Sequence, residues 1–222
     1  MNNRFQKIEP VSKKNQVLAI VKEAILSGEI SSGEQIVETR LAQQFGVGQG
    51  LIREALIELE HQGFVERTPF SGTQVTQFSR EDVSRIFDLR MELEPLAFTL
   101  AGQRATPAEL AEPGKLVAAM KQSAAAANRR EFFEQNLDYR RRVWAMAGNK
   151  YLAQTLQYLV IPLFALYIMR EPLNPVSQQR MVEGAAEQEA VFRALQTDAE
   201  EAGRLTRKYL QETKDKLYLL LR

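Results

Sequence analysis

The residues that could carry out chemistry in this 222-residue chain are few, and their types exclude most enzymatic mechanisms. The chain has no cysteine, and His61 is its single histidine. Thiolate nucleophiles, disulfides, cysteine-based metal sites and multi-histidine metal sites are therefore excluded. The sequence offers no nucleophile–base pair and no glycine-rich phosphate loop, so a helical-bundle enzyme is only a remote alternative. What remains is recognition chemistry by arginine and amide side chains.

Arg140 is the most informative of these side chains because its neighbours at helical spacing are apolar. Those neighbours are Phe133, Leu137, Trp144 and Ala147. Residues at this spacing share one face of a helix. Asn136 lies four residues before Arg140, and two later apolar stripes contain Gln188 and Tyr209. Polar groups that face a helical core need partners, and convergent polar groups in an apolar cavity are typical of a ligand site.

The chemistry expected at this site is the binding of an anion. A guanidinium group presents a planar fork that matches a carboxylate. We therefore expect Arg140 to hold an anionic effector, with Arg90 on another helix as a second clamp. The alternative is an internal salt bridge, for example between Arg140 and Glu94 or Glu189.

A second group of polar residues lies in a helix-turn-helix pattern. Two apolar periodic runs, at 41–45 and 51–59, are separated by Gly46-Val47-Gly48. An extended segment, Phe64–Phe78, follows with a turn at Ser71-Gly72-Thr73, so the motif is winged. The third helix of this unit is expected to be the recognition helix, with its N-terminal residues in the major groove.

This placement predicts a DNA-binding surface. The residues that it brings to DNA from the recognition helix are Gly48, Gln49, Gly50 and Arg53. Arg53 can bind a guanine edge or a phosphate, and Gln49 can pair with adenine. In the wing, Gly72 and Thr73 can approach the minor groove or a phosphate. The alternative for Arg53 is a surface salt bridge with a nearby glutamate, Glu54 or Glu58.

The unit resembles the winged helix-turn-helix of the GntR family of bacterial transcription regulators, over roughly residues 14–78. The matching residues are Gly33-Glu34, Leu41-Ala42, Val47, Arg53-Glu54-Ala55-Leu56, Leu59-Glu60 and Gly63-Phe64-Val65. The resemblance implies binding to an operator in double-stranded DNA, and it adds Arg40, which aligns with a family position that contacts DNA. The chain departs from the family at Gln49-Gly50-Leu51, where many members carry a basic residue, threonine, and then proline or threonine.

Beyond the wing, helical periodicity continues to the end of the chain. Ser79 with Glu81 and Asp82 predicts a helix start. Five apolar residues then share one face up to Arg104: Ile86, Leu89, Leu93, Leu96 and Leu100. Pro95 is expected to kink this helix or to remove one hydrogen bond. Further helices are predicted at about 106–127, 130–147, 150–170, 177–195 and 198–221.

The predicted fold is therefore mainly α in two domains. Residues 1–78 form a winged helix-turn-helix with three helices and a small β-hairpin wing, beginning with a loose arm at residues 1–12. Residues 79–222 form an antiparallel all-α bundle of about six helices.

The second domain resembles the FCD domain of the FadR-type branch of GntR regulators. The matches are Leu89-Arg90 with Leu93–Ala97, Ala147-Gly148-Asn149 with Leu152, and Ala194-Leu195 with Asp198–Ala202. Many FCD domains hold a divalent metal with an aspartate, a histidine four residues later, and two further histidines. The corresponding positions here, counted from the Gly148 turn, are Asn136, Arg140, Gln188 and Tyr209. None is a good metal ligand, so the resemblance implies a metal-free member in which Arg140 supplies the positive charge.

Composition adds limits on partners and location. The net charge of +1 is not a nucleic-acid footprint by itself, although a dimer doubles whatever basic face exists. The longest apolar run, Leu156–Met169, is too short to span a bilayer, and no signal segment is visible. We expect a cytoplasmic homodimeric repressor that a small carboxylate releases from DNA. The alternative is a regulator whose helical domain only dimerises.

Overall fold

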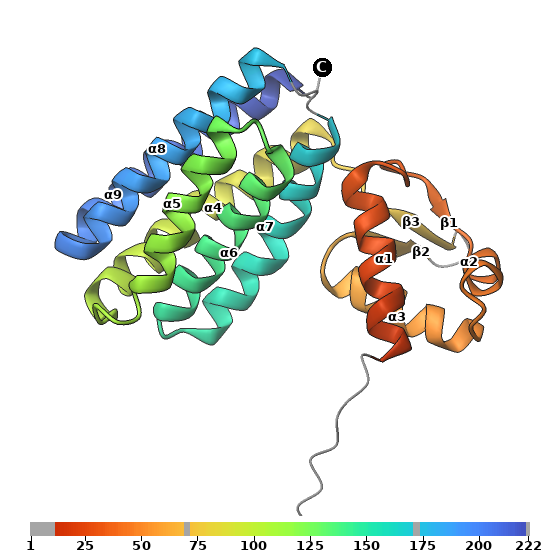
Figure 1. Ribbon diagram of the computed structural model, residues 1–222. Coiled ribbons are helices and arrows are strands. Elements are labelled where there is room, and N and C mark those ends of the chain that lie inside the picture. Colours follow the sequence, from red (N-terminus) through yellow and green to blue (C-terminus); the bar gives the residue numbers. More distant parts are fainter. Residues whose placement is uncertain (1–11, 69–71, 171–173, 221–222) are drawn as a thin grey trace, which may run out of the picture. The chain divides into compact units, whose positions relative to one another are not determined.

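The computed structural model describes residues 12–68, 72–170 and 174–220, with the side chains of 165–170 and 217–220 left out (Figure 1). The chain divides into two compact units, residues 1–77 and 78–222. The predicted N-terminal arm, the turn at Ser71 and part of the proline-rich turn after Arg170 lie outside the described residues. Within the described ranges, no helix has both the length and the apolar character required to cross a membrane.

The helices of the first unit are α1 (Lys13–Ser27), α2 (Glu38–Phe45) and α3 (Gln49–His61). Helix α1 begins at Ser12, whose hydroxyl accepts a hydrogen bond from the Asn15 backbone N–H at 3.2 Å. It ends at Gly28, whose φ of +80° favours glycine. Both α1 and α2 pack on α3, whose buried face consists of Ile52, Ala55, Leu56 and Leu59. The helical pattern predicted these four residues correctly.

A small antiparallel sheet completes the first unit, with the strand order β1-β3-β2 in the described residues. The strands are β1 (Gln35–Ile36), β2 (Val65–Thr68) and β3 (Gly72–Val75). The hairpin of β2 and β3 confirms the predicted wing, and its register pairs Val65 with Val75. The sequence did not reveal β1, because a strand of two residues is too short to show alternation.

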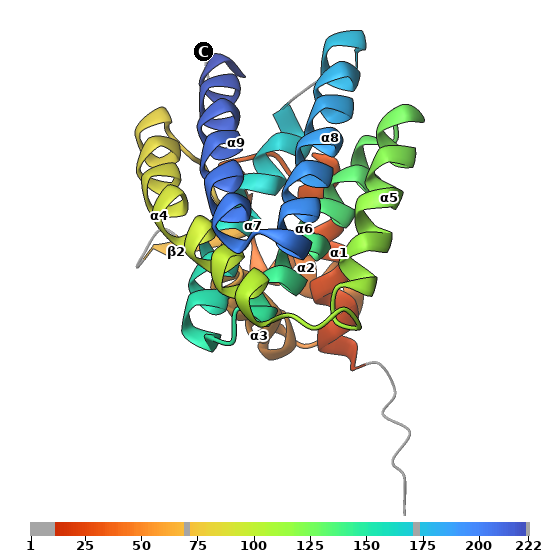
Figure 2. The same cartoon turned by 90° about the vertical axis from the view of Figure 1, so that its left-hand side faces the viewer.

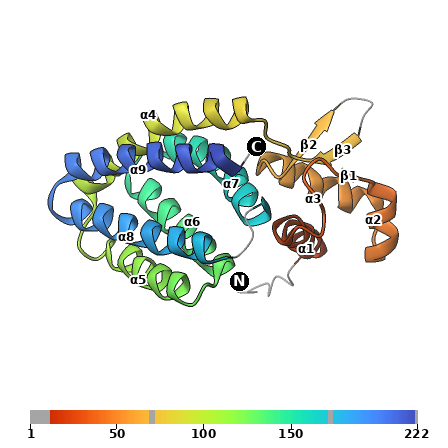
Figure 3. The ribbon, with the colours of Figure 1, turned by 90° about the horizontal axis from the view of Figure 1, so that it is seen from above.

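The second unit consists, in the part that the structure describes, of six helices, as the pattern predicted. They are α4 (Arg80–Arg104), α5 (Ala111–Ala125), α6 (Arg129–Met146), α7 (Lys150–Arg170), α8 (Pro175–Thr197) and α9 (Ala199–Leu220). Helices α4, α9, α8 and α5 lie side by side in that order, and α6 and α7 pack against them (Figures 2 and 3). Phe98, Tyr139 and Trp144 are among the large side chains of the common core.

The start of α4 is fixed by a capping box. The Ser79 hydroxyl accepts a hydrogen bond from the Asp82 N–H at 3.1 Å, and the Asp82 carboxylate accepts one from the Ser79 N–H at 3.0 Å. The bonds that the Ser79 hydroxyl and N–H donate lower the pKa of Asp82. The predicted helix start at Ser79 is thus confirmed. The helix continues through Pro95, which has no N–H to donate.

One prediction about the helical unit was wrong. Helix α5 begins at Ala111 and not at Thr106, because Pro113 lacks an N–H and is tolerated only in the first turn of a helix. Thr106 caps an isolated turn instead, in which the Glu109 carboxylate accepts the Thr106 N–H.

The leucine face of α4 is only partly buried. Leu93 and Leu100 pack against the core, whereas Leu89 and Leu96 are 52% and 48% exposed.

Candidate functional site

The first candidate site is the N-terminal end of α3. Gly48 is the N-cap, and the side of α3 formed by Gln49, Gly50 and Arg53 is exposed. A Cβ atom added at Gly48 or Gly50 would meet no heavy atom within 4 Å. Packing therefore does not require glycine at either position. These residues leave the backbone at the start of α3 open to close approach by a ligand.

Arg53 is held by an ion pair that crosses from α3 to α2. Its Nε and Nη2 atoms donate to Oε2 of Glu38 at 3.1 and 3.0 Å, and Nη2 of Arg67 donates to Oε1 of Glu38 at 3.4 Å. The predicted alternative partners, Glu54 and Glu58, were wrong. They lie one and five residues after Arg53 and do not face it on a helix, whereas the packing of α2 on α3 brings Glu38 beside it.

The remaining predicted DNA contacts differ in accessibility. Arg40 is exposed on α2, and Gly72 is exposed at the start of β3 with a φ of +88°. Thr73 is only 4% exposed because β3 is the central strand and Thr73 pairs with both Ile36 and Arg67. The side chain of Thr73 is therefore not accessible, and the approach of Gly72 and Thr73 to DNA stays a prediction.

The second candidate site is a cavity of about 110 Å³ within the helical unit. Four of the five predicted effector-binding residues line it: Arg90, Asn136, Arg140 and Gln188. They come from α4, α6 and α8, and all are less than 10% exposed. The apolar part of the wall comes from α6, α7 and α8 and includes Phe132, Phe133, Leu163, Phe164 and Met181.

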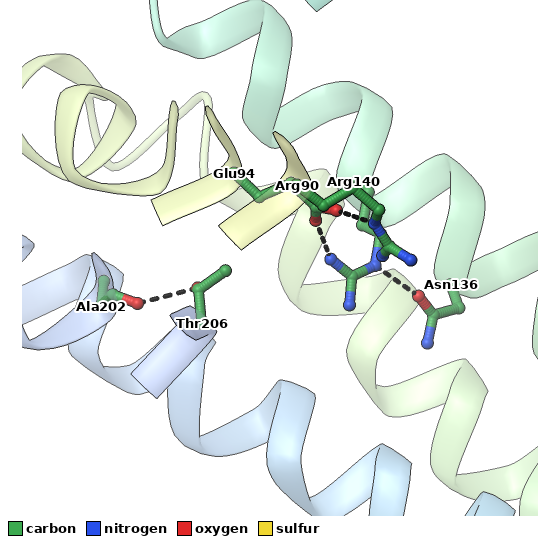
Figure 4. A network of polar contacts seen from close by, with 6 residues as sticks. All are labelled: Arg90, Glu94, Asn136, Arg140, Ala202 and Thr206. Atoms are coloured by element: carbon green, nitrogen blue, oxygen red, sulfur yellow. Dashed lines mark hydrogen bonds and ion pairs between the residues drawn. The ribbon is translucent and has the colours of Figure 1, made fainter. Parts of the chain in front are cut away.

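A glutamate and two arginines form a buried ion network at the wall of this cavity (Figure 4). Nε of Arg90 donates to Oε1 of Glu94 at 2.6 Å, and Nη1 of Arg140 donates to Oε2 of Glu94. Nε of Arg140 also donates to Oδ1 of Asn136 at 3.0 Å. The side chains of Arg90, Glu94 and Arg140 are 4%, 0% and 9% exposed.

This network confirms the alternative that Arg140 forms an internal salt bridge, and it identifies Glu94 as the partner. Glu189 pairs with Lys121 and Arg193 on the surface instead. Arg140 nevertheless lines the cavity together with the amides of Asn136 and Gln188. A cation in the wall of a largely apolar cavity attracts an anion.

Helix α9 contributes different residues from the predicted one. Tyr209 is half-buried against the core and does not line the cavity, whereas Thr213 and Lys216 do. The count along the sequence was therefore one helical turn too early on α9. Lys216 lies 3.6 Å from Glu187, which also lines the cavity. Burial raises the pKa of Glu187, and the charge of Lys216 opposes that rise.

Sequence reasoning missed Arg180, Glu187 and Lys216 in the cavity wall. These three residues are charged and belong to the more exposed turns of α8 and α9, so they resemble ordinary surface residues. The available signal was adjacency in the sequence. Glu187 directly precedes Gln188 and Arg180 directly precedes Met181, and both Met181 and Gln188 belong to the apolar stripe of this helix.

The donor set at this place does not fit a divalent metal. The groups that point to the cavity from the expected positions are the guanidinium of Arg140 and the amides of Asn136 and Gln188. A guanidinium group repels a cation and cannot be deprotonated at ordinary pH. Among the described residues, no group of three or more histidine, aspartate or glutamate side chains is arranged to hold a metal ion.

Comparison with known proteins gives two family matches. The model of the bacterial regulatory proteins of the gntR family matches residues 13–75, and the model of the FCD domain matches residues 85–212. The FCD match alone covers more than half of the 222 residues.

Individual relatives agree with these matches. The regulator YdhC of Bacillus subtilis is 38% identical over 90 residues, 40% of each chain, and McbR of Escherichia coli is 24% identical over 178 residues, 80% of each chain. The solved structure of E. coli McbR/YncC has a TM-score of 0.80 at 22% identity, covering 96% of this chain and 100% of that one. A GntR regulator from Rhodococcus sp. RHA1 has a TM-score of 0.77 at 15% identity, covering 95% and 99%. At these identities, the structural likeness shows the fold.

Proposed function

Since the chain belongs to the GntR family of bacterial regulatory proteins and carries an FCD domain, we propose that it is a homodimeric repressor that a small anionic metabolite releases from its operator. Its relatives are transcription regulators, and the chain is a transcription regulator and not an enzyme. Two relatives are named as repressors of a D-xylose utilization operon and a gluconate operon. Those names support the repressor role.

Operator binding would use the exposed end of α3. A recognition helix enters the major groove with its N-terminal residues toward the bases, which here are Gln49 and Gly50. Arg53 is 57% exposed and is held by Glu38, so its guanidinium is oriented before DNA arrives. A phosphate or a guanine edge can replace the partly exposed carboxylate of Glu38 as its acceptor, because ion pairs open to solvent are weak.

Two exposed apolar pairs support a homodimer formed by the helical unit. Leu89 and Leu96 lie seven residues apart on α4, and Tyr151 and Tyr158 lie seven residues apart on α7. Helices α4 and α7 pack on each other. The exposed fractions of these four large side chains range from 48% to 69%. Exposed apolar patches on soluble proteins mark interaction sites, and a two-fold interface uses the same patch from both copies.

The dimer proposal has a direct test. Leu96→Asp places a charge in the proposed interface, and Val182→Asp places one on the exposed side of α8 as a matched control. Light scattering should show a weaker dimer for Leu96→Asp only. Equal dimer strength in the two variants would contradict the proposed surface.

The observation that carries the effector proposal is the placement of Arg140 in the cavity wall. Its Nε and Nη1 atoms donate to Asn136 and Glu94, and Gln188, which is 5% exposed, lines the same cavity. A guanidinium group has five N–H donors, so these two bonds leave donors that a ligand carboxylate in the cavity can use.

Release of DNA requires that the effector bind one state of the dimer better than the other. Glu94 lies on α4, the helix that directly follows the DNA-binding unit in the chain. A ligand carboxylate on Arg140 would compete with Glu94 for the same guanidinium. The position of α4 would then depend on whether the ligand is bound.

The decisive experiment compares Arg140→Met with Arg130→Met. Both arginines lie on α6, but Arg130 is 58% exposed and pairs with Glu134, whose side chain is 50% exposed. Binding to DNA from the protein's own upstream region is measured at two salt concentrations, and small carboxylates are then scored by release of that DNA. We expect the Arg130→Met protein to respond like the unmodified protein and the Arg140→Met protein to bind DNA without responding.

The second candidate function is a regulator whose helical unit only dimerises. It is favoured if no carboxylate releases the DNA and none raises the melting temperature of the protein. A ligand that releases Arg140→Met as effectively as the unmodified protein would contradict the role of Arg140, although the cavity could still bind that ligand elsewhere.

A further inference from the structure

We propose that Arg67 on the wing and Arg53 on the recognition helix together bind one backbone phosphate of the operator. The helical pattern in the sequence singled out Arg53 but not Arg67, so Arg67 is a further residue at the DNA-binding surface. This inference rests on the proposed function, because the phosphate belongs to the DNA that the winged unit would bind.

A single carboxylate connects three elements of the winged unit. Glu38 is the first residue of α2, a position at which the helix dipole favours an acidic side chain. Its Oε2 atom accepts from Nε and Nη2 of Arg53 on α3, at 3.1 and 3.0 Å. Its Oε1 atom accepts from Nη2 of Arg67 on β2, at 3.4 Å. The two guanidinium groups are therefore held beside each other on the two oxygens of one carboxylate.

The register of the sheet explains why Arg67 reaches this place. Arg67 pairs with Thr73, which also pairs with Ile36, and residues directly opposite one another in a sheet point to the same face. Thr73 and Ile36 are 4% and 7% exposed, so this is the buried face of the sheet. Arg67 lies on the outer strand β2, and its side chain is 32% exposed. Glu66 and Gln74 bond to each other on the opposite face, at 2.7 Å.

Both guanidinium groups keep donors that a second acceptor can use. Among the residues that the structure describes, Glu38 is the one acceptor for the side chains of Arg53 and Arg67. Each guanidinium group has five N–H donors, so these three bonds leave most of the donors available. The side chains of Arg53 and Arg67 are 57% and 32% exposed, so an anion from solvent can reach both.

The position of the two arginines favours a phosphate over a base edge. In a helix-turn-helix, the recognition helix lies in the major groove, while the preceding helix crosses the DNA backbone. The preceding helix here is α2, and Glu38 holds Arg53 at its first turn. A phosphate group presents several oxygens, so it can accept from two guanidinium groups at once. Base reading is then left to the exposed first turn of α3, which begins at Gln49.

A phosphate shared in this way would join the wing to the recognition helix through the DNA. Phosphate contacts fix the register and orientation of a protein on the duplex, and base contacts supply the sequence preference. Glu38 keeps Arg53 and Arg67 close together before DNA binds, so less side-chain freedom is lost on binding.

The test uses a duplex from the protein's own upstream region and an unrelated duplex of equal length. Each phosphate of the first duplex is replaced in turn by an uncharged methylphosphonate, and its affinity is measured for the unmodified protein, Arg53→Met, Arg67→Met and the double variant. We expect one replacement in each half-site to weaken binding of the unmodified protein by about tenfold. The same replacement should have little effect on either single variant, because each has already lost that contact.

The salt dependence of binding gives a second readout. Each single variant should reduce the slope of log affinity against log salt by about 1 on both duplexes, and the double variant should also reduce it by about 1. Two arginines on separate phosphates would instead give a reduction of about 2 in the double variant. Glu66→Gln changes the charge on the opposite face of β2, so it is the control and should leave the slope unchanged.

A conservative variant and circular dichroism separate lost contacts from lost folding. Arg67→Lys keeps the positive charge but not the planar fork, so it should bind both duplexes more tightly than Arg67→Met and less tightly than the unmodified protein. Each variant should keep the helical signal of the unmodified protein, because the arginines are exposed and surface ion pairs contribute little stability.

The outcomes separate this inference from the proposed function. If the two single variants respond to different phosphates, or if the double variant loses about 2 from the slope, the shared phosphate is overturned and operator binding stands. If Arg67→Met binds both duplexes like the unmodified protein, Arg67 is not a DNA contact. If the unmodified protein binds neither duplex, the inference and the operator-binding part of the proposed function fail together.

Discussion

The two units of the molecule each place one glutamate between two arginines, and they do so in opposite environments. In the winged unit, Glu38 accepts from Arg53 and Arg67, and its side chain is 20% exposed. In the helical unit, Glu94 accepts from Arg90 and Arg140 and is fully buried. The composition of the two clusters is the same, one glutamate and two arginines.

The difference in burial decides what each cluster can do. An exposed ion pair contributes little to stability and exchanges its partners readily, which suits a surface that must release a carboxylate and accept a phosphate. A buried pair contributes little net stability when intact, but removing one partner leaves an unpaired charge in a medium of low dielectric constant. The buried cluster is therefore suited to recognise one added charge, and the exposed cluster to orient cations toward DNA.

The largest expected effect comes from removing each central glutamate. Glu94→Gln keeps the shape of the side chain and removes the carboxylate that the two buried arginines share, so the helical unit should lose about 3–5 kcal/mol of stability. Glu38→Gln should cost less than about 1 kcal/mol in the winged unit. Urea unfolding followed by Trp144 fluorescence reports the helical unit alone, because Trp144 is the only tryptophan in the chain.

Circular dichroism at the same urea concentrations reports the unfolding of both units, so it also measures the effect of Glu38→Gln on the winged unit. Equal losses in the two variants would mean that burial does not distinguish the clusters. A loss below about 1 kcal/mol for Glu94→Gln would show that water or a bound anion already compensates the arginines.

The next effect is on DNA binding. Arg53→Met removes a cation from the proposed recognition surface, so operator affinity should fall by about 1–3 kcal/mol if Arg53 reads a guanine. If it binds only a phosphate, affinity should fall about equally for operator and unrelated DNA, and the slope of log affinity against log salt should decrease by about 1. Arg130→Met is the matched control on the other unit and should leave both quantities unchanged.

The fold was predictable because its signals are local. The buried face of α3 and the capping box at Ser79 follow from spacing and side-chain chemistry in one short segment. The face of α4 was not predictable in the same way. Its leucines mark a face that is half exposed, while its core face carries Arg90 and Glu94, which periodicity counts as polar.

The candidate site was predictable only in part, for a related reason. Arg140, Asn136 and Gln188 interrupt apolar stripes, so a pattern of apolar spacing finds them. Tyr209 was misplaced because the position was counted from a distant turn, and the packing of α9 brings Thr213 to the cavity instead. The burial of the Thr73 side chain was not predictable, because pairing with β1 makes β3 the central strand and the sequence gives no sign of that pairing.

A third glutamate, Glu187, is intermediate in exposure between Glu38 and Glu94, and its environment predicts a pH dependence of ligand binding. Glu187 lines the cavity with its side chain 15% exposed, and burial raises its pKa while Lys216 opposes the rise. The neighbouring carboxylates of Glu212 and Glu183 raise it further. As pH falls toward this raised pKa, Glu187 becomes neutral and the cavity becomes more positive, so a small carboxylate such as benzoate should bind more tightly.

The measurement is calorimetry of benzoate binding between about pH 7.5 and about pH 5.5. We expect affinity to rise by up to about tenfold on acidification in the unmodified protein. Glu187→Gln should bind more tightly at the upper pH and should show little change across the range. An unchanged slope in that variant would assign the pH dependence to another group.

The smallest expected effect concerns the cluster of Glu38, Arg53 and Arg67 in the winged unit. Glu38→Gln removes a negative charge from the DNA-facing side and frees Arg53 and Arg67 from their shared acceptor. DNA binding should strengthen by about two- to fivefold at low salt, and the gain should shrink as salt screens the surface. Arg85 and Glu81 form an ion pair on α4 in which both side chains are 70% exposed, so Glu81→Gln is the control for removing a surface carboxylate outside the winged unit and should have no effect.

Weaker DNA binding by Glu38→Gln would be equally instructive. It would mean that Glu38 orients Arg53, and that losing this orientation weakens DNA binding more than the more positive surface charge strengthens it. Arg53 would then behave in the exposed cluster as Arg140 is proposed to behave in the buried one, as a cation whose direction is set by a glutamate.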